Sequence, residues 1–406
     1  MTKILVISLL SSLVVCTFTQ QNGLSIGDAL NNFASNLLRV TAEEAGNDMN
    51  LALSPYTVWS LLSIIAEGSR GNTARELEIS LNIPSEKTQF RKEYKSLQGL
   101  LQNKTPNVTL ELSSGIFTNK KHPLKQSFQR RTKEFYDADI MPVDFKNLKA
   151  STEFINNYIS KATNNRIPDL ISPDDLRDAE IFLTSTLYFK GDWQNPFNQT
   201  ATKKAPFFNE KGKEIAQVNM MYLSGFVPFL RLEALKSQAV LLRYGDGSKM
   251  AMVVILPMKG SSVSEVLSLM NRMPMRTILE KLREAEQQFV DEDVNVYLPK
   301  FSISSDLNLN IALDKLGIKD VFDSQKADLL DMVSQYLYIS RFVQKAEIVV
   351  NEEGTEASAA AGASAIYKQQ SPKFMANRPF IYSIVDSQAR SVIFNGVYRN
   401  PKTALN

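Results

Sequence analysis

The stretch NEEGTEASAAAGASAIYKQQSPKF, which runs from Asn351 to Phe374, decides how this sequence is interpreted. It separates two runs that are typical of β-strands, AEIVV at 346–350 and FIYSIVD at 380–386. Connections in folded domains usually have about four to six residues, and much longer ones tend to be functional or disordered. This connection consists largely of Ala, Gly and Ser, which have little surface to bury. The segment therefore calls for a functional explanation.

The composition of the chain indicates the general class of protein to which it belongs. It has 406 residues, a formal net charge of +3, 44% hydrophobic residues and 22% charged residues, as globular proteins do. The near-neutral charge gives no electrostatic basis for binding nucleic acid or a membrane, and we also expect no glycosaminoglycan binding. No internal repeat and no linker rich in Pro or Ser divides the chain. We therefore expect one domain over residues 20–406 and a monomeric protein.

The N-terminus, MTKILVISLLSSLVVCTFTQQ, has the pattern of a secretory signal. Lys3 is followed by an apolar run from Ile4 to Phe18, and Thr17 and Thr19 are small residues before a cut near Gln20. The run is short for a membrane-spanning helix, which needs about 20 apolar residues. A buried N-terminal helix is the alternative. The pattern predicts a signal peptide at residues 1–19 and a secreted, extracellular protein.

Cysteine usage and glycosylation motifs agree with secretion. The only cysteine, Cys16, lies inside the signal, so the mature protein has no disulfide, and a chain of this length can build a core without one. Three Asn-X-Thr motifs, at Asn103, Asn107 and Asn198, are candidate glycosylation sites. Pro106 makes the first of them the weakest candidate.

The residue types needed for common enzyme chemistry are scarce. A triad that depends on histidine would need His122, the only histidine, buried beside a nucleophile and an acid. Cys/His metal sites and phosphate-binding glycine loops are also missing from the sequence, so we expect no cofactor, no metal and no enzyme. The basic stretch 119–133 is open to two interpretations, a polyanion patch or an exposed helix face. Glu134, Asp137 and Asp139 follow it closely and favour the helix face.

The pattern along the chain predicts helices first and strands later. Three helical regions are expected, at 26–42, 54–81 and 151–171: the second turns at Gly68 and Gly71 and resumes at Thr73, and the third begins at Ser151 or Thr152 and ends before Pro168. Strands are expected at 179–191, 239–245, 249–258, 294–303, 346–350, 380–386 and 391–398. This order predicts an α+β fold with large, mostly antiparallel sheets.

Several of these segments resemble the serpin family, in order and along nearly the whole mature chain. The matching segments are LSPYTVWSLL (53–62), EGSRGNTARELE (67–78), LYFKGDWQNPF (187–197), VNVYLPKFSI (294–303), LDKLGIKDVF (313–322), EEGTEASAA (352–360) and FMANRPFIYSI (374–384). The resemblance implies the serpin fold, in which helices pack on three β-sheets. It also implies an exposed reactive-centre loop, at about 352–374, that can insert into the main sheet.

The resemblance implies a mechanism for the long loop. A target protease cuts the loop and forms an acyl-enzyme, and the hinge side then enters the main sheet as a new strand. The hinge residues are Glu353, Gly354, Thr355, Glu356, Ala357, Ser358, Ala359, Ala360 and Ala361. Because side chains alternate along a strand, Thr355, Ala357, Ala359 and Ala361 would face the core, and Glu356, Ser358 and Ala360 would face outward. Small inward residues fit between parting strands.

The family's spacing also places the cut. Counting forward from Gly354 and back from Pro379 puts Lys368 before the scissile bond, which is then Lys368–Gln369. A lysine pairs with a carboxylate in the primary pocket of a protease, so the target is expected to be trypsin-like. Tyr367 is the alternative and would select a chymotrypsin-like protease.

Two positions differ from the family pattern. Ser185 stands where many serpins have Asn, and Gln344 stands where many have His. In the family these residues bond beneath the strands that part, a sheet-opening region to which Ser54 also belongs. Buried polar groups need partners, so we expect Ser185 and Gln344 to pair directly or through water.

The sequence therefore predicts a suicide inhibitor that forms a covalent complex with a secreted trypsin-like serine protease. The nearest resemblance is to insect haemolymph serpins, several of which restrain protease cascades in melanisation or Toll-type immunity. The alternative is a non-inhibitory serpin acting as a carrier, chaperone or storage protein. Such members usually carry bulky, charged or proline residues in the hinge, whereas 355–361 has no proline and, apart from Glu356, only small residues.

Overall fold

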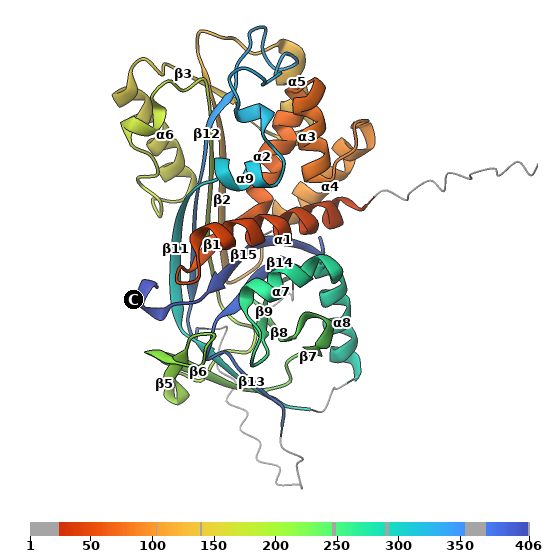
Figure 1. The fold of residues 1–406 in the computed structure, drawn as a ribbon, viewed down its shortest axis with the longest axis vertical. Coiled ribbons are helices and arrows are strands. Elements are labelled where there is room, and N and C mark those ends of the chain that lie inside the picture. Colours follow the sequence, from red (N-terminus) through yellow and green to blue (C-terminus); the bar gives the residue numbers. More distant parts are fainter. Residues whose placement is uncertain are drawn as a thin grey trace, which may run out of the picture.

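The structure is a computed structural model that describes residues 24–102, 104–138, 140–245, 249–288, 292–353 and 371–404. The predicted signal peptide lies outside these ranges. Figure 1 shows helices packed on both sides of long, twisted strands. Within the described ranges, no helix is long and apolar enough to cross a membrane.

The α-helices are mostly N-terminal. Their bounds are α1 Ile26–Ala45, α2 Pro55–Gly68, α3 Gly71–Leu81, α4 Thr88–Gln102, α5 Gln126–Tyr136, α6 Leu148–Ala162, α7 Val263–Leu269, α8 Met275–Gln288 and α9 Asn310–Lys315. Every residue of α2 is buried. A helix that is hydrophobic all round belongs in the interior, and α2 accordingly contacts α1, β2, β4 and β15.

The strands form three sheets, as the resemblance to serpins implies. The five-stranded sheet has the order β11 (Phe301–Asn308), β12 (Ile339–Val350), β4 (Ile181–Gly191), β2 (Val108–Asn119), β3 (Ile140–Val143). The six-stranded sheet has the order β1 (Leu51–Leu53), β15 (Ser391–Tyr398), β14 (Phe380–Asp386), β9 (Met250–Pro257), β8 (Ser237–Tyr244), β7 (Phe229–Leu232). The four-stranded sheet has the order β13 (Lys373–Met375), β10 (Val294–Pro299), β6 (Glu214–Gly225), β5 (Lys203–Phe208). Most pairs are antiparallel, and β12–β4, β2–β3 and β10–β13 are parallel.

The parallel pair β4–β12 lies at the centre of the five-stranded sheet. It is aligned from Ile181 opposite Ile339 to Lys190 opposite Val349. Figure 1 shows α6 on one side of this sheet and α2 on the other. Each face of the pair is therefore covered by a helix, and the long loop begins just beyond the end of β12.

The predicted element boundaries need correction in several places; β12, for example, begins at Ile339 rather than at 346, and α6 ends at Ala162. Helix α3 begins at Gly71 rather than Thr73, and Thr73 instead accepts from the backbone N–H of Asp328. Helix α6 begins at Leu148, because the capping side chain is that of Asn147. The run 294–303 is two strands that separate at Lys300, and the last part of the predicted loop, 373–374, already belongs to β13.

Candidate functional site

A buried polar cluster lies where β4 and β12 meet the start of α2. We call Ser54, Thr57, Ser185 and Gln344 the gap cluster. Gln344 Nε2 donates to Ser185 Oγ at 2.8 Å and to the carbonyl oxygen of Ser54 at 3.0 Å. Gln344 Oε1 accepts from the backbone N–H of Ser54 at 3.1 Å. Ser185 and Gln344, both 0% exposed, are therefore in direct contact.

Thr57 completes the gap cluster, although no sequence pattern marks it. Its Oγ1 donates to the carbonyl oxygen of Ser54 at 3.1 Å and lies 2.5 Å from Ser185 Oγ. The hydroxyl of Ser185 therefore donates to Thr57, while its oxygen accepts from Gln344. This series of hydrogen bonds gives each of these side chains a partner, as a buried polar network needs. It joins β4, β12 and α2 at one point.

The gap cluster predicts a measurable loss of stability in Gln344→Leu. The variant fills similar volume but leaves the buried backbone N–H of Ser54 without its acceptor. An unsatisfied buried group costs about 1–3 kcal/mol, so the free energy of unfolding in urea is expected to fall by about that amount. Gln217, exposed on β6, offers the control Gln217→Leu. Equal urea midpoints for the two variants would contradict the role of Gln344.

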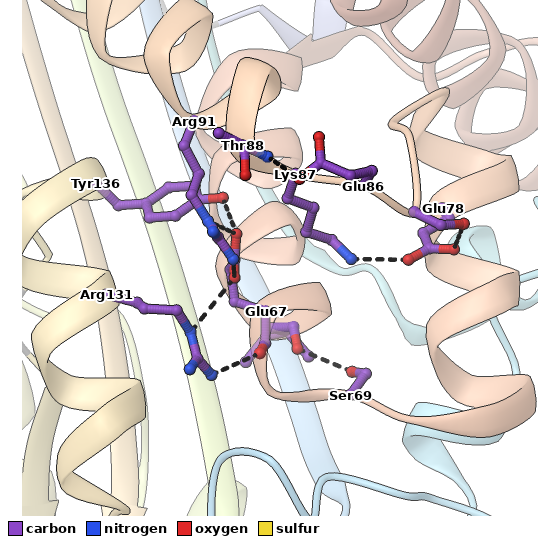
Figure 2. Close-up of polar contacts among 11 residues, drawn as sticks. Glu67, Ser69, Glu78, Glu86, Lys87, Thr88, Arg91, Arg131 and Tyr136 are labelled. Atoms are coloured by element: carbon purple, nitrogen blue, oxygen red, sulfur yellow. Dashed lines mark hydrogen bonds and ion pairs between the residues drawn. The ribbon is translucent and has the colours of Figure 1, made fainter.

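The other end of α2 is fixed by a buried carboxylate (Figure 2). The Glu67 side chain is 1% exposed. Arg91 of α4 donates to it through Nε at 3.0 Å and Nη2 at 2.7 Å. From α5, the Tyr136 hydroxyl donates to Glu67 Oε1 at 2.8 Å, and Arg131 Nη2 donates to the backbone carbonyl of Glu67 at 3.2 Å. Helix α2 therefore connects the gap cluster to α4 and α5.

Glu67 shifts the pKa values of two of its partners. The bidentate hydrogen bonds to Glu67 raise the pKa of Arg91 above its ordinary value. Burial, and then the negative charge of Glu67, raise the pKa of Tyr136 far above its usual range. Removing one partner of a buried ion pair leaves the other charge uncompensated. The junction thus attaches α2 to α4 and α5 through a buried carboxylate whose hydrogen bonds are satisfied.

The chain is anchored where it leaves β12 for the loop. The indole N–H of Trp193 donates to the carbonyl oxygen of Asn351 at 2.7 Å. The backbone N–H of Trp193 donates to the carbonyl oxygen of Glu353 at 3.0 Å. Trp193 itself stacks on Tyr244, with ring centroids 4.2 Å apart. Trp193, which lies just beyond the end of β4, therefore holds Asn351 and Glu353 immediately before the loop.

Two carboxylates strengthen this anchor. Glu352 is 8% exposed, and its side chain accepts from Lys300 Nζ at 2.9 Å and from Thr202 Oγ1 at 3.0 Å. Burial raises the pKa of Glu352, but these hydrogen bonds outweigh it, and the net pKa is below the ordinary value. Glu353 pairs with Lys190 of β4 at 2.7 Å, which lowers the pKa of Glu353 and raises that of Lys190. The Lys190–Glu353 pair bridges the two central strands where the loop begins.

The remaining predicted site residues divide into two groups. The hinge residues Gly354, Thr355, Glu356, Ala357, Ser358, Ala359, Ala360 and Ala361, the bond Lys368–Gln369 and the candidate glycosylation site Asn103 lie outside the described residues. Asn107 and Asn198 are exposed. Asn198 Oδ1 accepts from the backbone N–H and the hydroxyl of Thr200.

The structure shows how the basic stretch 119–133 is arranged. Lys120 pairs with Asp144, Lys133 with Asp137, and Arg131 with Glu67. His122 is half-buried in a turn, with Nε2 3.8 Å from Oε2 of Glu180. Only residues 126–133 of this stretch lie on helix α5, whereas Lys120 and His122 lie in the turn after β2, so the expected helix face covers only the second half of the stretch. The pairing with acidic side chains argues against a polyanion patch. In the described part of the chain, no group of three His, Cys, Asp or Glu side chains could hold a metal ion.

Comparisons with known proteins agree with this architecture. The family model described as Serpin (serine protease inhibitor) matches residues 28–401. The leukocyte elastase inhibitor of Sus scrofa is 33% identical over 378 residues, covering 91% of this chain and 97% of that protein. The crystal structure of Manduca sexta serpin-12 has a TM-score of 0.78 and 27% identity, covering 92% of this chain and 98% of that chain. Serpin48 of Tenebrio molitor has a TM-score of 0.75 and 26% identity, covering 94% and 98%. The chain therefore belongs to the serpin family of serine protease inhibitors.

Proposed function

We propose that the protein is a suicide inhibitor of a secreted trypsin-like serine protease. The observation that carries the proposal is the long connection from β12 to β13, which starts where the parallel β4–β12 pair ends. The protease serine attacks the carbonyl carbon of Lys368 and forms an ester. The Lys368–Gln369 amide bond breaks, and the new amine of Gln369 takes up the proton.

The loop then inserts between β4 and β12. The ladder of hydrogen bonds between β4 and β12 breaks, and one new ladder forms on each side of the inserted strand. Each backbone hydrogen bond contributes about 0.5–1.5 kcal/mol net, so about a dozen additional bonds stabilise the inserted state by on the order of 10 kcal/mol. This gain drives insertion before the ester hydrolyses. The attached protease is displaced with the loop and remains trapped as an acyl-enzyme.

We further propose that the protein is secreted, glycosylated and monomeric, and that it restrains a protease cascade of insect immunity such as melanisation or Toll signalling. The N-terminal signal pattern and the exposed Asn107 and Asn198 support secretion and glycosylation. The similarity to serpins of Manduca sexta and Tenebrio molitor supports the insect setting.

Incubation with trypsin tests the proposal. We expect a complex of inhibitor and protease that survives boiling in detergent, and a released peptide that begins at Gln369. Trypsin whose active-site serine is chemically blocked serves as the control, because it can bind the loop but cannot form the ester. Cleavage after Lys368 without a stable complex would overturn the suicide mechanism and favour the non-inhibitory carrier, chaperone or storage protein.

A further inference from the structure

The connection from α6 to β4 crosses the outer face of the central strand pair. We call residues 163–180 the strap. Ile171 and Leu176 of the strap belong to one hydrophobic cluster with Phe182 of β4 and Val343 of β12. The same cluster includes buried residues of α6, which Figure 1 shows on this side of the sheet. The strap therefore covers part of the line along which β4 and β12 meet.

One end of the strap is attached to β2 and β4. Asn164 Nδ2 donates to Glu111 Oε1 of β2 at 2.7 Å. The guanidinium of Arg166 lies 4.9 Å from the ring centroid of Tyr188 of β4. Both contacts lie on the β4 side of the line between β4 and β12, and the strap itself leads into β4. They do not require β12 to stay in place.

The other end of the strap reaches across the β4–β12 pair and is attached to β12. Asp175 forms an ion pair with Arg341 of β12. Asp175 also accepts from the backbone N–H of Ser172 at 2.8 Å and from its hydroxyl at 2.7 Å, which fixes the carboxylate. Burial raises the pKa of Asp175, but the bonds from Ser172 and Arg341 outweigh it, so the net pKa is below the ordinary value. The carboxylate is therefore charged at neutral pH.

Opening of the strand pair is incompatible with this contact. Neighbouring strands lie about 4.8 Å apart, so a new strand between β4 and β12 doubles their separation. Asp175 lies six residues before the start of β4 and is tied to the strand that moves away from Arg341. We propose that the Asp175–Arg341 ion pair is a latch: it is one of the contacts that must open before a strand enters, and it slows insertion. This inference rests on the loop insertion proposed above.

Uptake of a free peptide tests the latch without any protease. The peptide GTEASAAAGASAIY has the sequence of residues 354–367 and serves as the incoming strand. Its uptake is followed as the growth of a population with a higher melting midpoint. Arg341→Gln removes the charge from β12 while leaving Asp175 bonded to Ser172. Because the pair is partly exposed, its loss is expected to make uptake about threefold to fivefold faster.

The strap itself offers a matched control. Arg177 pairs with Asp174 at 2.7 Å, and both residues lie on the strap, so Arg177→Gln removes a surface ion pair that does not cross the gap. This variant is expected to take up peptide at the unaltered rate. Asp175→Asn should accelerate uptake as Arg341→Gln does, and the double variant should be no faster than either single variant.

The outcomes separate this inference from the function on which it rests. Equal uptake rates for Arg341→Gln, Asp175→Asn and Arg177→Gln would overturn the latch. A faster double variant would show that the two side chains act independently, which also overturns it. If the unaltered protein takes up no peptide, loop insertion itself is wrong. In about 1 M salt, where the screening length is about 3 Å, the unaltered protein should approach the rate of Arg341→Gln.

Discussion

Replacing Lys368 by Glu is expected to lower the rate of trypsin inactivation by about a thousandfold or more. The primary pocket of a trypsin-like protease presents a carboxylate to the substrate side chain. Two unit charges about 4 Å apart attract by about 4 kcal/mol at an effective dielectric constant of 20, and each 1.36 kcal/mol corresponds to a tenfold change in rate. Reversal of the charge replaces this attraction with repulsion. The second-order rate constant of inactivation measures the effect.

The loop's neighbourhood provides a control for the same charge change. Lys373 is exposed on β13, with its Nζ 4.7 Å from the ring centroid of Tyr297. Lys373→Glu alters the net charge equally but leaves Lys368 in place, so inactivation should stay within a few-fold of the unaltered rate. An unchanged rate in Lys368→Glu would instead assign the cut to another residue. Inhibition of chymotrypsin by that variant would identify Tyr367.

The strands that the sequence predicts correctly are those with continuous β-branched or aromatic runs. Strand β2 was missed although it adjoins β4, because Ser113, Ser114 and Gly115 interrupt its apolar pattern. The glycine has a packing reason: a Cβ at Gly115 would lie 2.6 Å from the ring of Phe117 and 2.7 Å from Thr184 Oγ1. Close packing of the sheet thus requires a residue that weakens the strand signal. Strands β1 and β13, with three residues each, are too short to give a pattern.

Some residues of the candidate site can be identified from the sequence, and others come together only in the fold. Ser185 and Gln344 were found because they lie at fixed places in recognisable segments, and the structure shows them in contact. Thr57 joins them only through the fold, although it is the third residue after the capping Ser54. Asp175 and Arg341 are 166 positions apart. Such pairs depend on the register of β4 with β12, which no local pattern encodes.

Substitutions in the hinge test which side chains face the core when the loop enters the sheet. Side chains of a strand face opposite ways in turn, so Thr355 faces the core if the small residues of the hinge do. Thr355→Arg would then bring a long charged side chain into the interior, whereas Glu356→Arg would leave its charge in water. Burying an unpaired charge costs several kcal/mol even after relaxation. The two neighbouring positions should therefore differ sharply.

Inhibition depends on whether insertion is faster than hydrolysis of the acyl-enzyme. A barrier raised by 1.4 kcal/mol slows a step about tenfold, and the burial cost at Thr355 exceeds this. Thr355→Arg is therefore expected to be cut after Lys368 and to release active protease, so that the number of inhibitor molecules consumed per protease inactivated rises at least about tenfold. Glu356→Arg should consume nearly the unaltered number. Titration of trypsin activity measures both, and equal numbers would show that Thr355 does not face the core during insertion.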